Sequence, residues 1–181
     1  MTEIASKLML KSMSVNSSTL AKHVAVFRIG FGIIWAIDAA FKWLPSFRNG
    51  FLDQITTAAQ GQPSWLNSWF NFWVHLLGHN PQLFAVSVAL IESLIAIALI
   101  FGFARRTTYL SAIVFTLLIW GIAEGFGGPY NSASTDIGTA IIYAVVFFAL
   151  YGLERLAVPP KWTVDNYICK KMPWWSVVAN P

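Results

Sequence analysis

The amino-acid sequence predicts an all-α polytopic membrane protein: a four-transmembrane-helix bundle with short interfacial helices in its first outer loop. Hydrophobic residues make up 56% of the 181 residues and charged residues only 11%, against roughly 25% charged in soluble domains. Four apolar runs are each about 20 residues long, which at 1.5 Å per residue crosses a hydrocarbon core of about 30 Å. The predicted spans are residues 24–44, 83–103, 107–126 and 137–158.

The chain is long enough for one such bundle and no separate soluble domain. The predicted parts are a cytoplasmic N-terminal segment (1–23), the transmembrane domain (24–158, in which 45–82 form an outer aromatic cap loop) and a cytoplasmic tail (159–181). The first segment lacks an apolar core followed by a small-residue cleavage site, so we expect span one to be an uncleaved anchor. Ser17, Ser18 and Thr19 are candidate N-caps for its helix.

The basic residues are distributed unevenly between the two sides of the predicted bundle. Ten of the twelve Lys and Arg residues fall on the side of the two termini, and only Lys42 and Arg48 fall on the other. The positive-inside rule makes the side with more basic residues cytoplasmic. We therefore expect a multi-pass protein of the cell (inner or plasma) membrane with both termini in the cytoplasm. Lipid is the expected partner; the net charge of +4 does not indicate nucleic-acid binding.

Five ionisable residues lie inside the spans or at their ends: Asp38, Lys42, Glu92, Glu124 and Asp136. A charge near the bilayer centre costs on the order of 2.5–3.5 kcal/mol, so it usually has a partner or a role. Asp38 and Lys42 stand four apart, which predicts an ion pair. The acids all fall in the outer half, which leaves two interpretations open: ion pairs that tie helices together, or a polar pocket below the cap loop. We expect no comparable group of acids in the inner half, which disfavours a path for protons through the membrane.

Two helical stripes indicate which residues face the interior. Residues at intervals of three and four share one face of a helix. The stripe in span one consists of Arg28, Phe31, Trp35, Asp38 and Lys42, and the stripe in span four of Asp136, Thr139, Tyr143, Phe147 and Leu150. In span two, Glu92 stands among small residues, which allow another helix to approach closely.

The two outer connections carry different signals. The first is rich in aromatic residues (Trp65, Trp69, Phe70, Phe72 and Trp73), which is typical of helices in the membrane interface. The second, residues 125–134, is rich in glycine and is either an anion cradle or, more simply, a tight turn.

Three further features of the sequence are best explained without a catalytic or metal-binding role. His75 and His79 stand four apart, as in helical metal sites, but no third ligand is evident, so a solvated pair is favoured and no metal site is predicted. Cys169 is expected to be a reduced bystander thiol. Trp174 and Trp175 are expected to anchor the tail at the cytoplasmic interface.

Short motifs along the chain resemble those of the DoxX/DoxD-like family of four-helix membrane proteins. They are Arg28-Ile29-Gly30, Lys42, Glu92, Thr135-Asp136-Ile137-Gly138-Thr139 and Ala149-Leu150-Tyr151-Gly152. The resemblance covers roughly residues 24–152, and the long first outer loop is more similar to the DoxD branch. That branch includes the membrane subunit of thiosulfate:quinone oxidoreductase, which oxidises thiosulfate to tetrathionate and passes electrons to a membrane quinone.

The resemblance implies a membrane subunit of a redox complex that couples oxidation of a small sulfur anion outside the membrane to quinone reduction. Quinone is then the expected cofactor, and a protein with a redox centre the expected partner, because this chain shows no evident electron carrier. Glu92 and Asp38 are the candidate proton donors. The candidate binding residues are Lys42, Arg48, Trp35, Trp120, Glu124, Asp136 and Tyr143. A non-catalytic assembly subunit is the alternative, and a small-solute carrier is a weaker one.

Overall fold

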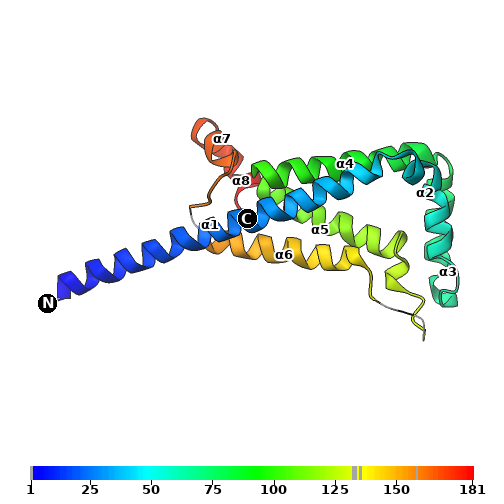
Figure 1. The fold of residues 1–181 in the computed structure, drawn as a ribbon, viewed down its shortest axis with the longest axis horizontal. Coiled ribbons are helices and arrows are strands. Elements are labelled where there is room, and N and C mark those ends of the chain that lie inside the picture. The colour runs from blue at the N-terminus through cyan, green and yellow to red at the C-terminus, as the bar shows by residue number, and fades with distance from the viewer. Residues whose placement is uncertain (1, 132–133, 135, 158) are drawn as a thin grey trace.

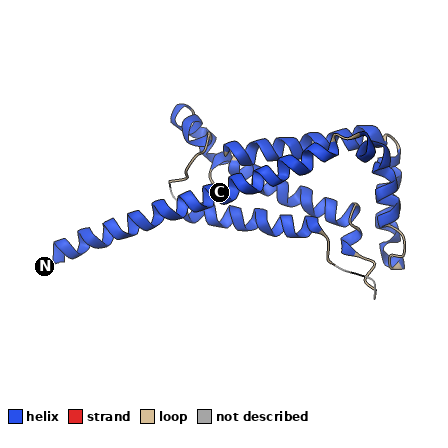
Figure 2. Ribbon diagram, in the orientation of Figure 1, coloured by secondary structure: helices blue, strands red, loops and turns tan. Residues whose placement is uncertain are grey.

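The computed structural model describes residues 2–131, 134, 136–157 and 159–181, with side chains from residue 17 onward. This part of the chain is built from helices joined by short loops and contains no strand (Figure 2). The predicted end of span four at Val158, and Ser132, Ala133 and Thr135 in the second outer connection, lie outside the described residues.

The helices follow one another as α1 (Thr2–Lys42), α2 (Pro45–Ala58), η1 (Ser64–Leu66), α3 (Asn67–Gly78), α4 (Pro81–Phe101), α5 (Arg105–Ile122), η2 (Gly125–Gly127), α6 (Thr139–Leu156), α7 (Asp165–Lys171), η3 (Pro173–Trp175) and α8 (Ser176–Ala179). Proline occupies the first position of α2 and of α4, where its missing N–H has no intrahelical partner to lose. The Asn80 side chain accepts a hydrogen bond from Leu83 N at 3.1 Å and caps α4.

Three described helices are long and apolar enough to cross a membrane: Ser17–Lys42 within α1, Pro81–Phe101 (α4) and Thr139–Leu156 (α6). α5 has 18 residues, the same number as α6, but it opens with Arg105 and Arg106, which lower its mean hydropathy. The protein is therefore a helical membrane protein with three such helices, and the fourth span stays a prediction.

The predicted helix start at Ser17, Ser18 or Thr19 is wrong. α1 is continuous from Thr2 to Lys42, and its N-terminal part extends well beyond the other helices (Figure 1). Residues 2–16 include two Lys, two Leu and two Met, which have high helix propensity and allow the helix to continue past the three serine and threonine residues.

The four long helices form two pairs that diverge from one end of the bundle to the other. α1 packs along α4, and α5 packs along α6. The pairs lie close together beside α8 and separate towards α2 and α3 (Figure 1). We call the end covered by α2 and α3 the cap end, and the end where α7 and α8 lie the tail end.

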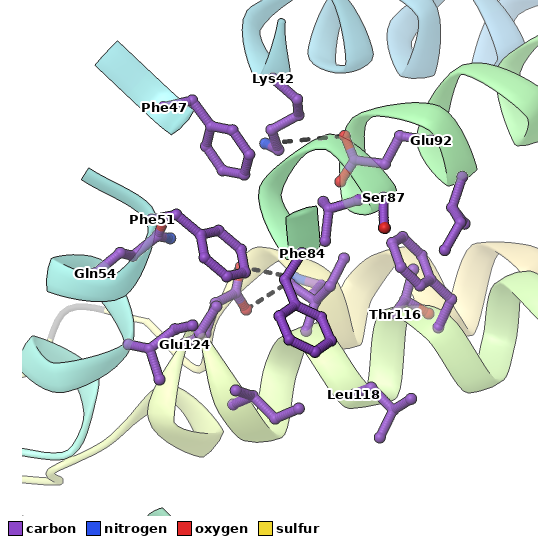
Figure 3. Close-up of a pocket in the computed structure, with 18 of the residues that line it drawn as sticks. Lys42, Phe47, Phe51, Gln54, Phe84, Ser87, Glu92, Thr116, Leu118 and Glu124 are labelled. Carbon is purple, nitrogen blue, oxygen red and sulfur yellow. Dashed lines mark hydrogen bonds and ion pairs between the residues drawn. The ribbon is translucent and has the colours of Figure 1, made fainter. Parts of the chain in front are cut away.

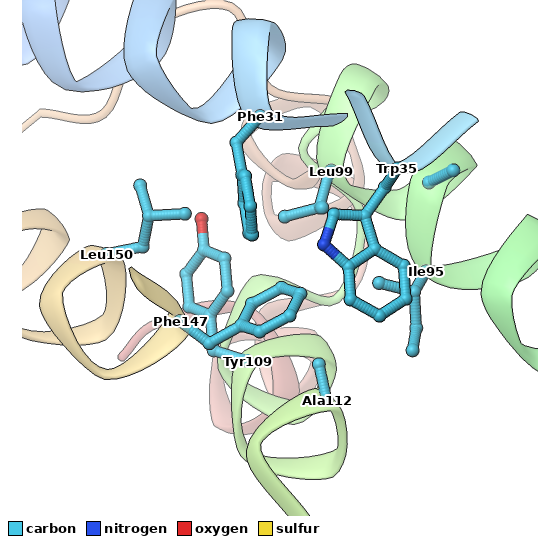
Figure 4. Packing of buried hydrophobic residues seen from close by; sticks show 9 residues of the cluster. Phe31, Trp35, Ile95, Leu99, Tyr109, Ala112, Phe147 and Leu150 are labelled. Carbon is cyan, nitrogen blue, oxygen red and sulfur yellow. The ribbon is translucent and has the colours of Figure 1, made fainter. Parts of the chain in front are cut away.

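A buried core joins the two pairs on the tail side of the divergence. It consists of Phe31, Trp35, Ile95, Ala96, Leu99, Tyr109, Ala112, Phe147 and Leu150, so α1, α4, α5 and α6 all contribute. Figure 4 shows the aromatic rings meeting between the helices; the ring centroids of Phe31 and Phe147, for example, are 5.0 Å apart. Close packing of this kind holds the helices together in the absence of a hydrophobic force between them.

The cap end has a second buried cluster that fastens α2 and α3 to the bundle. Phe51 and Ile55 of α2, Leu77 of α3, Ala85 of α4 and Ile122 of α5 form it. Trp69 of α3 also donates its indole N–H to Gly121 O at 2.9 Å. The predicted cap loop is thus helical and packed on the bundle; its position at a membrane interface stays a prediction.

A buried network of charges lies at the tail end, which corrects the expectation that nothing comparable to the outer acids exists there. Arg105 Nη1 lies 2.5 Å from Glu154 Oε2, and Arg28 Nε lies 3.3 Å from Glu154 Oε1. Arg105 Nε also lies 3.0 Å from Asp165 Oδ2. All four side chains are buried. Because each charge has an opposite partner, α1, α5, α6 and α7 are tied together at this end.

Asp165 also fixes the tail against the start of α5. Its carboxylate accepts hydrogen bonds from Ala104 N at 2.7 Å and Arg105 N at 3.1 Å, and so caps the positive end of that helix. Trp175 donates its indole N–H to the same carboxylate at 2.8 Å and packs on Phe103. Trp175 therefore holds the tail to the bundle, whereas Trp174 remains exposed.

Candidate functional site

A cavity of about 490 Å³ lies at the cap end, where the two helix pairs diverge (Figure 3). Its walls come from all four long helices and from α2 and α3. The lining is mainly aromatic and aliphatic, and includes Phe47, Phe51, Trp73, Phe84 and Phe115. This size and composition are those of sites that bind small apolar molecules through a few polar groups.

Six of the nine candidate residues line this one cavity. They are Trp35, Asp38, Lys42, Glu92, Glu124 and Tyr143. All four predicted spans thus contribute to a single site. The cavity supports the interpretation that the membrane acids line a pocket below the cap. Its walls are more apolar than the polar pocket that we expected from the sequence.

Lys42 lies between two acids on one side of the cavity. Its Nζ is 3.4 Å from Asp38 Oδ1, which confirms the predicted ion pair, and 4.0 Å from Glu92 Oε2. Figure 3 shows the Lys42 and Glu92 side chains pointing towards one another beside Phe47. The ammonium also lies 5.3 Å from the centre of the Phe47 ring, a cation–π distance. Lys42 is therefore positioned both to neutralise an acid and to donate to a ligand.

Two polar atoms of the cavity walls are buried without a hydrogen-bond partner among the described residues: Glu92 Oε2 and the indole N–H of Trp73. Buried polar groups are normally paired, because leaving one unpaired costs about 1–3 kcal/mol. Groups left unpaired beside a cavity are available to a bound molecule. Trp35 Nε1 is also unpaired, but Figure 4 shows this nitrogen turned into the core, so Trp35 offers the cavity its ring.

Glu124 lines the cavity but also has a local structural role. Its two carboxylate oxygens lie 3.2 and 3.0 Å from Ala140 N, so the side chain caps the N-terminus of α6 (Figure 3). A carboxylate is stabilised there by the helix dipole. Among the described residues, Glu92 is thus the cavity acid that is buried and accepts no hydrogen bond from a backbone N–H.

The remaining three candidate residues do not line the cavity. Trp120 donates to Ile137 O at 2.7 Å and lies against Phe126. Asp136 accepts a hydrogen bond from Gly138 N at 2.7 Å. Arg48 lies on α2, where its carbonyl accepts from Gln82. These residues shape the cap end rather than the cavity.

The histidine pair and the glycine-rich turn remain away from the cavity as well. His75 and His79 are exposed, with ring centroids 4.7 Å apart. No group of three or more His, Cys, Asp or Glu side chains that could hold a metal is found within the described residues. The N–H groups of Gly127 and Gly128 donate to carbonyls of the same turn, which favours the tight turn over the anion cradle.

Sequence reasoning missed most of the cavity's aromatic wall and the whole tail-end network. Phe84 and Phe115 have no sequence signal, because an aromatic residue in an apolar span is unremarkable in composition. Glu154 does have one, because it is an acid near the end of predicted span four. Asp165 could not be found, because its partners are about 60 residues away along the chain.

Comparison with known proteins gives a family for this chain. The DoxX family model matches residues 23–125, more than half of the sequence. This region contains α2, α3, α4, α5 and most of the apolar part of α1, and hence all the cavity residues except those of α6. Searches of curated proteins and of solved structures found no match. With a family match over the helices that build the cavity, the chain belongs to the DoxX family of membrane proteins.

Proposed function

We propose that this protein is the integral membrane subunit of a redox complex, and that its cap-end cavity binds the headgroup of a lipid-soluble quinone. The observation that carries the proposal is the pairing of an apolar, aromatic cavity with a buried carboxylate oxygen and an indole N–H that have no partner among the described residues. Quinone headgroups are flat and apolar and carry two carbonyl oxygens, which accept hydrogen bonds.

The residues present fit such a headgroup. Trp73 and Lys42 would donate hydrogen bonds to the carbonyl oxygens, and the rings of Trp35, Phe51 and Phe84 would contact the flat faces. A quinone held there would supply an acceptor for two electrons and two protons. Glu92, as a carboxylic acid, would supply one proton at the cavity wall. Asp38, half-exposed beside Lys42, would return a proton from water to the Glu92 carboxylate, which would then supply the second.

The electrons would come from a partner subunit with its own redox centre. Oxidation of two thiosulfate ions to tetrathionate, the reaction implied by similarity to the DoxD branch, releases the two electrons that one quinone requires. Among the described residues that line the cavity, Asp38, Glu92 and Glu124 are acids and Lys42 is the one cation, which disfavours a dianion inside it. We therefore place sulfur-anion oxidation on the partner and quinone reduction on this chain.

The topology that this function requires is a four-span bundle in the cell membrane with both termini in the cytoplasm. α5 is 18 residues long, or about 27 Å at 1.5 Å per residue, and its exposed face carries Leu110, Val114 and Leu117. Its buried Arg105 is neutralised by Glu154 and Asp165. We therefore propose that α5 is the fourth span.

The test is purification of the full chain from native membranes in mild detergent, followed by a quinone-reduction assay on the purified complex. The proposal predicts copurification with a redox protein and quinone reduction that Glu92→Gln removes while the complex stays assembled. A complex whose quinone reduction is unchanged by Glu92→Gln would contradict it and favour a non-catalytic assembly subunit. A homo-oligomer with neither partner nor quinone would contradict it too.

A further inference from the structure

We propose that the cavity opens sideways to the lipid between α4 and α5, and that the isoprenoid tail of the bound quinone leaves through this opening. The inference rests on the proposed function. It adds the path that the tail of the quinone follows and the residues that contact this tail. The relevant residues are Phe84, Val88 and Ile91 on α4, and Phe115 and Leu118 on α5, all of which line the cavity.

The spacing of these residues places them on one face of each helix. Phe84, Val88 and Ile91 recur at intervals of four and three, as residues on one helical stripe do. Phe115 and Leu118 are three apart on α5. α4 and α5 are joined by a short link at the tail end and diverge towards the cap (Figure 1), so the two stripes border the widening space between them.

Two of these residues belong both to the cavity wall and to the outer surface. Ile91 is 39% exposed and Leu118 is 38% exposed, yet both line the cavity. A side chain in both places marks an opening. In a membrane protein, exposed apolar surface faces lipid, and the neighbouring Leu90, Leu94 and Leu117 extend that surface on both helices.

The opposite side of the cavity has a different chemical character. Asp38 and Lys42 of α1 and Thr139 and Tyr143 of α6 line it, and Thr139 is exposed, so the cavity is open on this side as well. An isoprenoid chain has no polar atoms to pair with these groups, so passage beside them would leave them desolvated and unpaired. The side between α4 and α5 suits the tail better, because its two hydroxyls, those of Ser87 and Thr116, already donate to carbonyls of their own helices. The polar side suits water and protons.

The experiment compares two ligands that share one headgroup, a benzoquinone with a ten-carbon tail and the same benzoquinone without it. Binding of each to the full-length protein in detergent is measured by titration calorimetry. The test variants are Ile91→Trp and Leu118→Trp, which fill the proposed opening. The matched controls are Ile97→Trp and Val114→Trp, which enlarge exposed residues of the same helices that do not line the cavity.

We expect the tailed quinone to bind the test variants at least about tenfold more weakly than wild type, a change of about 1.4 kcal/mol. The tail-less quinone should bind all variants alike, and the controls should match wild type with both ligands. Equal loss of both ligands in the test variants, or no loss of either, would overturn the side opening. Failure of wild type to bind either ligand would instead overturn the proposed function.

Discussion

Lys42 Nζ lies 4.0 Å from Glu92 Oε2, and that oxygen is buried with no hydrogen-bond partner among the described residues. The ammonium is close enough to stabilise the carboxylate but does not hold it by a hydrogen bond. The same ammonium is 3.4 Å from Asp38. A ligand that binds beside Glu92 can therefore shift the Lys42 ammonium between Asp38 and Glu92 without breaking a hydrogen bond to the backbone.

Replacing Glu92 by Gln should remove quinone reduction and leave the complex assembled. The substitution keeps the size of the side chain but removes the proton that it donates, and a general acid of this kind contributes typically 10²–10⁴-fold. Turnover of the purified complex should fall by about that factor. Asp53→Asn, on the exposed face of α2, is the control and should retain wild-type turnover; an active Glu92→Gln complex would refute the role of Glu92.

Replacing Lys42 by Met should weaken quinone binding about tenfold or more. Met keeps the apolar stem but removes the donor, and a hydrogen bond from a charged group contributes about 1.5–3 kcal/mol. The dissociation constant measured by titration of the purified protein checks this. Lys22→Met, at an exposed position of the same helix, should bind quinone as wild type does. Equal effects of the two substitutions would mean that Lys42 acts through overall charge and not through the cavity.

Replacing Arg105 by Gln should destabilise the protein far more than replacing Arg106 by Gln. Arg105 is buried between Glu154 and Asp165, and removing one member of a buried ion pair typically costs about 3–5 kcal/mol. Arg106 is exposed, and such surface changes usually stay within about 0.5 kcal/mol. Thermal unfolding in detergent measures both. Matching melting temperatures for the two variants would show that the tail-end network does not stabilise the fold.

The adjacent tryptophans of the tail provide a second matched pair. Trp175→Ala removes the hydrogen bond to Asp165 and the ring contact with Phe103, so we expect residues 159–181 to be cleaved faster by an added protease. Trp174→Ala removes an exposed ring and should leave the cleavage rate unchanged. The reverse order of sensitivity would mean that the tail is not held as described.

Replacing Gly127 by Ala should destabilise the turn after α5. Gly127 has φ of 77°, and a Cβ there would meet the backbone of Ile137; the left-handed conformation alone costs a non-glycine residue roughly 1–2 kcal/mol. Gly50 lies within α2 with nothing within 4 Å of an added Cβ. Gly50→Ala should therefore leave the melting temperature unchanged or raise it. A melting temperature unaffected by Gly127→Ala would contradict this account of the turn.

The helical class and the inward face of α1 could be predicted from the sequence, because both depend on local pattern. The interval of three and four residues from Arg28 to Lys42 gave a stripe whose inner members, Arg28, Phe31 and Trp35, are buried. The Asp38–Lys42 pair follows from the same helical geometry. The DoxX family match is consistent with the motifs in α1 and α4 that suggested it.

The helix caps formed by residues distant in the sequence could not be predicted, because no local sequence pattern indicates them. Asp165 caps α5 and Glu124 caps α6 across a turn, whereas capping rules consider only the residue just before a helix. The length of α1 was missed for a different reason. Three candidate N-caps suggested a start, but Ser and Thr are also tolerated within a helix that favourable neighbours continue.

The central claim is that the cap-end cavity binds a quinone, and photoaffinity labelling tests it most directly. A quinone with a photoreactive group on its ring would be reacted with the full-length protein in membranes, and the modified peptides identified by mass spectrometry. The account predicts labels on cavity residues of α1, α3 and α4, such as those near Lys42, Trp73 and Glu92, that excess unlabelled quinone removes. Labels confined to lipid-facing residues such as Leu94 and Val114, and unaffected by competitor, would contradict it.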